Sequence, residues 1–155
     1  MRPTLPFAFA LAASALPARA ADAPPARATE GPARLVVSAD AAPTYVIVGG
    51  KGQATLLHNL DTGSHEAALS VLVLAPGAEV PVHVHPTSAE FLYIESGTCE
   101  LIIGGVKSVA GPGSAVRIPA GVPHSAKVIS AVQSLRAVQF YVGPGPEQRF
   151  KAAAK

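Results

Sequence analysis

The chain has 155 residues, of which 49% are hydrophobic, 14% charged and 5% aromatic, with a formal net charge of +2. This length suits one domain with a hydrophobic core and is short for two. No basic run is present and aromatic residues are sparse, so the composition does not favour nucleic-acid binding. Cys99 is the only cysteine, which excludes an intramolecular disulfide.

The first twenty residues have the pattern of a secretory signal peptide. Arg2 gives a positive start, residues 7–16 are apolar, and Ala18-Arg19-Ala20 matches the small-x-small cleavage site. A membrane anchor is the alternative, but a span needs about 20 apolar residues, roughly twice this run. We therefore expect residues 1–20 to be removed and the protein to be periplasmic or extracellular, with no membrane anchor. Their loss removes two arginines and leaves a mature chain near neutral charge.

A Pro- and Ala-rich stretch follows at residues 21–33, and its composition predicts a flexible linker. From residue 34 onward, short runs rich in Val, Ile and Leu alternate with Gly, Pro, Asn and Asp, which is typical of strands joined by turns. The predicted strands are 35–37, 45–48, 54–57, 67–74, 80–85, 90–95, 98–103, 106–109, 115–118, 125–129 and 132–142. No segment except the tail shows helical periodicity. We therefore predict an all-β fold, a single barrel or sandwich over 34–142, with a C-terminal tail at 143–155 outside it. Within the tail, Phe150 is expected to pack on the barrel and residues 151–155 to fray.

Three histidines and one glutamate stand out in this pattern. His83 and His85 are two residues apart in a predicted strand, so their side chains share one face. A Pro-containing turn then leads to Glu90, and a hairpin-like return there would carry its carboxylate over the two imidazoles. His124 comes from a separate turn framed by prolines.

Imidazoles and a carboxylate are donors that suit one divalent transition metal, namely Fe, Mn, Ni, Cu or Zn. No thiolate accompanies them to favour an iron–sulfur or Cu(I) site. The chain therefore predicts a metal site at His83, His85, Glu90 and His124. A single strand histidine is more often an ordinary surface or core residue, so the prediction depends on the four acting together.

The spacing of these residues resembles the cupin family. Its first motif, Gly-x5-His-x-His-x3–4-Glu-x6-Gly, is matched from Gly77 to Gly97 with every ligand position filled. Its second motif, Gly-x5-Pro-x-Gly-x2-His-x3-Asn, is matched from Gly113 to His124, and Val128 replaces the Asn. That Asn is not a ligand, so its loss leaves the predicted metal contacts intact. The resemblance covers about residues 66–142.

The cupin resemblance implies a small jelly-roll barrel (a double-stranded β-helix) with its metal site inside. It also implies a small-molecule ligand or substrate and makes a homodimer the expected assembly. Two functions stay open. One is an exported small metalloenzyme, such as a dioxygenase-like oxidoreductase or an isomerase. The other is a non-catalytic binding or sensing module whose ion is a structural anchor. No catalytic residue beyond the ligands is assigned.

Several further residues receive expectations from their position. Strand alternation puts Leu92 and Ile94 on the face of Glu90, which predicts a mostly apolar pocket. The polar strand residues Arg117, Gln139 and Tyr141 are expected to face outward or to lie at the barrel rim. His58 and His65 are expected in exposed loops, apart from the metal site. Cys99 is expected in a core strand.

Overall fold

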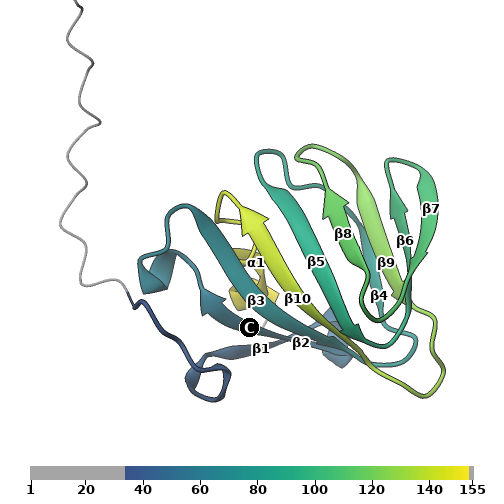
Figure 1. Ribbon diagram of the computed structural model, residues 1–155, viewed down its shortest axis with the longest axis horizontal. Coiled ribbons are helices and arrows are strands. Elements are labelled where there is room, and N and C mark those ends of the chain that lie inside the picture. Colours follow the sequence, from purple (N-terminus) through teal and green to yellow (C-terminus); the bar gives the residue numbers. More distant parts are fainter. Residues whose placement is uncertain (1–33, 154–155) are drawn as a thin grey trace, which may run out of the picture.

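Ten β-strands make up about half of the computed structural model, which describes residues 34–153. They form two antiparallel sheets that face each other (Figure 1). The large sheet has the order β1-β2-β3-β10-β5-β8 and the small sheet the order β4-β9-β6-β7. The strands are β1 Thr44–Ile47, β2 Gly52–His58, β3 Ala67–Leu74, β4 Glu79–His83, β5 Ala89–Ser96, β6 Cys99–Ile103, β7 Val106–Ala110, β8 Ala115–Ile118, β9 His124–Val128 and β10 Leu135–Val142.

The predicted all-β barrel is confirmed, and the predicted strands differ from the observed ones mainly at their ends. No strand forms at 35–37, where Leu35 and Val36 are exposed. The last predicted strand starts at Leu135 rather than at residue 132, because residues before it form a turn at 130–133. The hydrophobic run at 35–37 resembles a strand locally, but none of the strands in residues 34–153 pairs with it.

Short helices complete the described chain. Three 3-10 turns lie at Ala39–Ala41, Val48–Gly50 and Leu60–Thr62, and a single α-helix, α1, spans Gln148–Ala153. None of the described helices has the length and apolar character needed to span a membrane. The expected signal peptide and linker, residues 1–33, lie outside the described residues.

Every second side chain along the strands points into the space between the two sheets and fills it. In β10, Leu135, Ala137, Gln139 and Tyr141 are buried while the intervening residues face outward. The buried hydrophobic cluster draws on both sheets and on α1; it comprises Ile47, Ala54, Leu56, Leu72, Leu74, Ala78, Ile94, Cys99, Leu101, Ala110, Val128, Leu135, Ala137 and Phe150. Cys99 therefore lies in the core, as predicted, and burial raises the pKa of its thiol, which makes a reactive thiolate unfavourable.

The C-terminal tail is part of the folded body rather than an appendage. Phe150 in α1 is only 5% exposed and joins the core cluster. Lys151 forms an ion pair with Asp61, and α1 packs against β1. The expectation that the chain frays from residue 151 is therefore wrong for 151–153, which are helical, while 154–155 lie outside the described residues.

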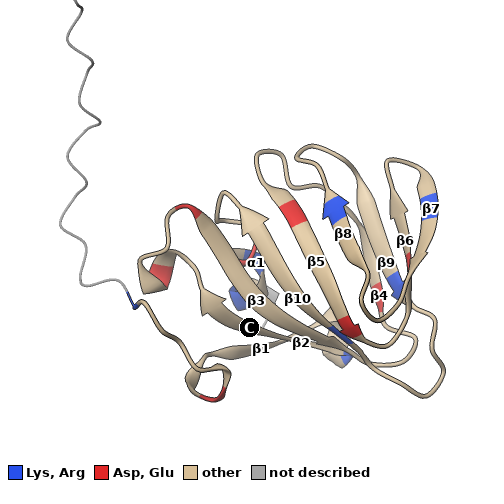
Figure 2. Cartoon of the chain, viewed as in Figure 1, with Lys and Arg blue, Asp and Glu red and all other residues tan. Residues whose placement is uncertain are grey.

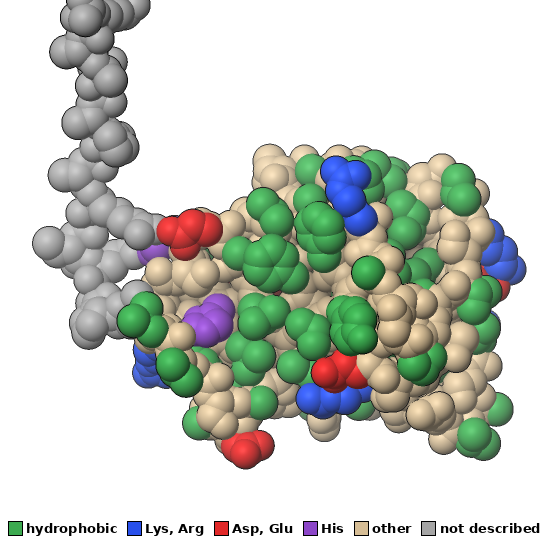
Figure 3. Space-filling view, in the orientation of Figure 1, with side chains coloured by type: hydrophobic (Ala, Val, Ile, Leu, Met, Phe, Trp, Pro, Cys, Tyr) green, Lys and Arg blue, Asp and Glu red, His purple; other side chains and the backbone are tan. Residues whose placement is uncertain are grey.

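The outer face of the large sheet carries a group of hydrophobic side chains (Figure 3). Tyr93, Phe140 and Val142 belong to it, with exposed fractions of 52%, 38% and 49%. Charged side chains are few and of mixed sign over the strands (Figure 2). Several of them form surface pairs, such as Arg136 with Glu95 at 2.6 Å, and such pairs contribute little to stability.

Candidate metal centre

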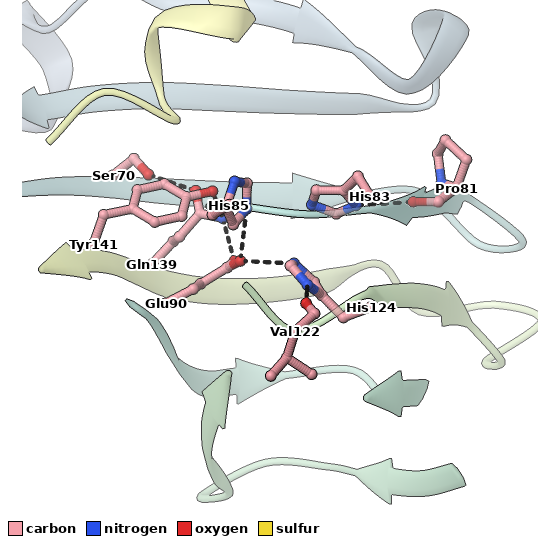
Figure 4. Close-up of polar contacts among 9 residues, drawn as sticks. All are labelled: Ser70, Pro81, His83, His85, Glu90, Val122, His124, Gln139 and Tyr141. Atoms are coloured by element: carbon pink, nitrogen blue, oxygen red, sulfur yellow. Dashed lines mark hydrogen bonds and ion pairs between the residues drawn. The ribbon is translucent and has the colours of Figure 1, made fainter. Parts of the chain in front are cut away.

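The four predicted ligands come together between the sheets (Figure 4). One donor atom from each of His83, His85, Glu90 and His124 lies within 4.8 Å of the other three. Metal–donor bonds of about 2.0–2.2 Å allow opposite donors to lie roughly 4.3 Å apart. A small contraction would therefore place all four on one ion.

Local structure delivers three of the four ligands differently from the sequence expectation. His83 is the last residue of β4, and His85 lies two residues beyond the strand rather than within it. Glu90 does not return as a hairpin, because β4 belongs to the small sheet and β5 to the large one. The turn at 84–88 instead crosses between sheets and brings the carboxylate from the opposite wall.

His124 is also placed by strand pairing. It is the first residue of β9, not a turn residue, and its register partner in β4 is His83. The ring centroids of these two histidines are 4.1 Å apart. Direct cross-strand neighbours lie close enough for their side chains to share a partner, so sheet register alone joins two of the four ligands.

Backbone carbonyls fix two of the imidazoles. The Nδ1 atom of His83 lies 2.8 Å from the carbonyl oxygen of Pro81, and Nδ1 of His124 lies 2.8 Å from that of Val122. A carbonyl only accepts, so each Nδ1 carries the proton and donates it. In the neutral ring the Nε2 lone pair then points into the site, which is the orientation that metal-ligating histidines need.

The atoms that face one another in the site lack conventional partners. Nε2 of His83, His85 and His124 and Oε2 of Glu90 are buried and have no hydrogen-bond partner within the described part of the chain. Oε2 of Glu90 lies 3.2 Å from Nε2 of both His85 and His124, but neither contact has hydrogen-bond geometry. Buried polar groups normally have partners, so this donor set fits a bound cation.

The electrostatic environment sets the protonation states of His83 and Glu90. Burial, reinforced by the positive charge of Arg149, outweighs the Pro81 carbonyl and lowers the pKa of His83 to about 4. For Glu90, burial acts to raise the pKa, but His124, His85 and Gln139 outweigh it and lower the pKa to about 2. His83 is therefore a neutral imidazole and Glu90 a carboxylate, the forms that bind metal.

His124 differs from His83. Burial acts to lower its pKa, but the Glu90 carboxylate and the Val122 carbonyl outweigh burial and raise it. A metal ion would therefore compete with a proton at His124 more than at His83.

A buried polar chain holds the glutamate in place. Nε2 of Gln139 donates to Oε1 of Glu90 at 2.6 Å and also lies 2.8 Å from the Tyr141 hydroxyl oxygen. The Ser70 hydroxyl donates to Oε1 of Gln139 at 2.9 Å, which sets the orientation of the amide. Burial and the Glu90 charge raise the pKa of Tyr141, so its hydroxyl stays protonated.

These contacts overturn part of the sequence expectation. Gln139 and Tyr141 were expected to face outward or to lie at the rim, but they are 2% and 0% exposed and face the site. Strand alternation could have found them, since both share the parity of Leu135 and Ala137. Arg117 is exposed on β8, as expected.

His58 and His65 do not join the group of four. His58 is the last residue of β2 rather than a loop residue, and its side chain is half-buried. His65 lies in the loop before β3, as expected, but its side chain is half-buried rather than exposed.

A cavity of about 430 Å³ adjoins the four ligands. His83, Glu90 and His124 form part of its wall, and the remaining wall is largely apolar. The other lining residues come from both sheets and from the C-terminal segment: Leu72, Leu92, Ile47, Val48, Leu74, Val80, Pro81, Leu101, Ile118, Ser125, Ala126, Leu135, Ala137, Gln139, Arg149 and Phe150. The predicted apolar pocket is thus present, although Ile94 packs in the core cluster instead of lining it.

Two facing antiparallel sheets with a three-histidine, one-glutamate group between them define a double-stranded β-helix with a group positioned for a metal ion. The cupin domain family model matches residues 70–139. The chain is 31% identical over 109 residues to Protein SchB from Streptomyces halstedii, an alignment covering 70% of this chain and 77% of that protein. The protein belongs to the cupin family.

Solved structures show the same fold. An RmlC-like cupin from Shewanella frigidimarina superposes with a TM-score of 0.63 at 20% identity, covering 76% of this chain and 96% of that one. A predicted oxalate decarboxylase from Thermotoga maritima gives 0.63 at 19% identity, with coverages of 70% and 99%. The polyketide cyclase RemF from Streptomyces resistomycificus gives 0.59 at 23% identity, with coverages of 68% and 76%.

Proposed function

We propose that this cupin binds one divalent transition metal, Fe, Mn, Ni, Cu or Zn, through His83, His85, Glu90 and His124. The observation that carries the proposal is the set of four buried donor atoms that face one another without hydrogen-bond partners. Leaving a buried polar atom unsatisfied costs about 1–3 kcal/mol, and a shared cation would remove that cost at all four atoms. Their nitrogen and oxygen chemistry fits these metals.

We further propose that the centre serves a small metalloenzyme, dioxygenase-like or another oxidoreductase, that acts on a small and mostly apolar molecule. A bound ion of this kind can polarise a substrate oxygen or, if redox-active, support oxygen chemistry. The cavity of about 430 Å³ beside the ligands is large enough for a small-molecule substrate. A six-coordinate ion would keep two positions for atoms other than the four protein donors.

The chain's own residues would prepare this reaction. The carbonyls of Pro81 and Val122 hold two imidazoles with their lone pairs inward. Gln139 holds the Glu90 carboxylate through one oxygen and leaves the other facing the histidines. The apolar walls would exclude water and bury the body of the substrate.

The relatives give limited support for an enzyme. One structural neighbour is a predicted oxalate decarboxylase and another a polyketide cyclase, and both names describe enzymes acting on small molecules. Their identities to this chain are 19% and 23%, so they support the fold and leave the substrate open.

A non-catalytic binding or sensing module is the second candidate, and one observation favours it. Apart from the metal ligands, the polar side chains lining the cavity are Ser125, Gln139 and Arg149. Side chains of these three types do not ordinarily titrate near neutral pH, so none of them is suited to act as a general acid or base. In this alternative the ion anchors a ligand or joins the sheets.

Export and assembly complete the proposal. The signal-peptide pattern of residues 1–20 supports a periplasmic or extracellular location. The exposed hydrophobic side chains of Tyr93, Phe140 and Val142 support a homodimer through the large sheet. Sedimentation of the wild type against Phe140→Asp would test the dimer, and a monomeric wild type would contradict it.

Elemental analysis of the purified protein, followed by oxygen uptake with diketones, phenols and thiols, tests the function. We expect close to one metal ion per chain and metal-dependent turnover of at least one substrate class, with neither retained in His85→Ala. Metal without turnover or oxygen uptake would favour the binding module. A wild-type protein that binds no divalent metal would overturn both forms of the proposal.

A further inference from the structure

The C-terminal helix brings a cation to the cavity. Arg149 and Phe150 are both part of the cavity wall, although they follow the last strand by several residues. The turn before α1 is fixed by Glu147, which is fully buried and accepts the Gly145 backbone N–H at 2.6 Å. Lys151 ties the helix to Asp61. The backbone position of Arg149 is therefore set by contacts on both sides of it, while its side chain is exposed to solvent and forms part of the cavity wall.

The Arg149 guanidinium has no acidic partner among residues 34–153. Arg136, by contrast, pairs with Glu95 at 2.6 Å. The guanidinium carbon of Arg149 lies 5.2 Å from the ring centroid of Phe150, a cation–π distance that favours one orientation of the side chain without neutralising its charge. Arg149 lines the same cavity as His83, Glu90 and His124, so its charge acts on the same enclosed space.

The charge balance of the cavity favours an anion. Among the described residues, Glu90 is the only acidic side chain on the wall, and it faces imidazoles and accepts from Gln139. With a divalent ion bound, as proposed above, the ion and Arg149 together carry more positive charge than Glu90 offsets. Because the remaining wall is largely apolar, an incoming monoanion would meet little competition from other polar groups.

We propose that Arg149 selects a small monocarboxylic acid whose apolar body fills the cavity. A guanidinium presents a planar fork of donors that matches both oxygens of a carboxylate. The walls offer the ligand body the side chains of Leu72, Leu101 and Ile118 from both sheets. The inference rests on the proposed small-molecule role of this cavity and names its substrate class, but recognition by Arg149 does not require the ion.

A matched ligand series tests this. Phenylacetate, 3-phenylpropionate and 4-phenylbutyrate would be titrated against the full chain beside their primary amides, which keep the shape and lose the charge. We expect the wild type to bind the best acid about tenfold more tightly than its amide, the size of one charge-assisted hydrogen-bonded contact. Arg149→Gln should remove this preference while amide affinity stays unchanged, and Arg149→Lys should keep part of it.

The control is Arg117→Gln, an exposed position on β8 outside the cavity wall, which should keep the full preference. Metal content is measured on every sample, and each titration is repeated after metal removal. Loss of the metal alone would count against the proposed function, while the acid preference of the metal-free protein reports on Arg149. Equal binding of acid and amide by the wild type, no binding of either, or a preference that survives in Arg149→Gln would overturn the inference.

Discussion

Replacing Gln139 with leucine tests whether the buried polar chain positions the metal ligand Glu90. The substitution keeps an inward side chain of similar length on β10 and removes every polar atom. It deletes the amide that donates to Glu90 at 2.6 Å and the acceptor used by the Ser70 hydroxyl at 2.9 Å. The carboxylate would then be free to rotate away from the three imidazoles.

The magnitude follows from the contacts that are lost. A hydrogen bond to a buried charged group contributes about 1.5–3 kcal/mol, and a buried hydroxyl left without a partner costs about 1–3 kcal/mol. Allowing for the hydrophobic gain from leucine, we expect Gln139→Leu to lower the free energy of unfolding of the metal-free protein by about 3 kcal/mol. Loss of a group that orients a metal ligand lowers affinity about 10–100-fold, which we expect here.

Urea unfolding in the presence of chelator measures the stability, and competition with a chromophoric chelator measures the metal affinity. Ser70→Ala is the graded comparison, because it removes only the hydroxyl that orients the amide and should cost about 1 kcal/mol. Gln53→Leu, on the exposed face of β2, is the matched control and should change neither quantity. Wild-type metal affinity in a folded Gln139→Leu would refute the positioning role.

Four further predictions concern the site, a turn and the N-terminus. His85→Ala should lose most of its bound metal by elemental analysis, whereas His58→Ala should retain a wild-type content. Metal affinity, measured by the same competition at several pH values, should fall in two stages as the pH drops, because a protonated imidazole has no lone pair to donate. The first fall should begin above the usual histidine value of about 6.5, where the raised pKa of His124 lies, and the second should come near the pKa of His83 at about 4; a flat profile would contradict histidine ligation. Gly97→Ala should lower the unfolding midpoint more than Gly105→Ala: both glycines have φ near +80°, but a Cβ at Gly97 would meet backbone atoms from 2.5 Å and one at Gly105 meets none within 4 Å. Mass spectrometry of protein from the native host should find Ala21 at the N-terminus, and an intact precursor would contradict export.

Most of the strands could be predicted from the sequence because their cues are local. Runs such as 67–74 and 115–118 were predicted with the observed bounds, since turn residues flank an apolar run on both sides. The false strand at 35–37 shows the limit of this reasoning. A strand needs a neighbour to pair with its backbone, and no local pattern tells whether one is available.

The ligands of the site could also be predicted, but the groups around them could not be assigned. The four donors lie in two gapped motifs whose spacing is visible in the chain. Gln139 and Ser70 are 69 residues apart in sequence and meet only because β10 pairs with β3 in one particular register. The apolar side chain of Phe150 indicates that the tail packs on the barrel, but no local pattern indicates that the neighbouring Arg149 lies at the cavity wall.

The distribution of the ligands over the sheets has a mechanical consequence. His83 and His124 are register partners in the small sheet, whereas Glu90 projects from β5 in the large one. No hydrogen bond joins Oε2 of Glu90 to these histidines, so an ion shared by all four donors would be a strong polar link across the barrel at this point. A ligand that binds only the folded state stabilises that state, and the gain grows with the logarithm of the ligand concentration divided by Kd. The same ion would therefore hold the two walls of the cavity together. The apolar side of the cavity would stay open to a ligand.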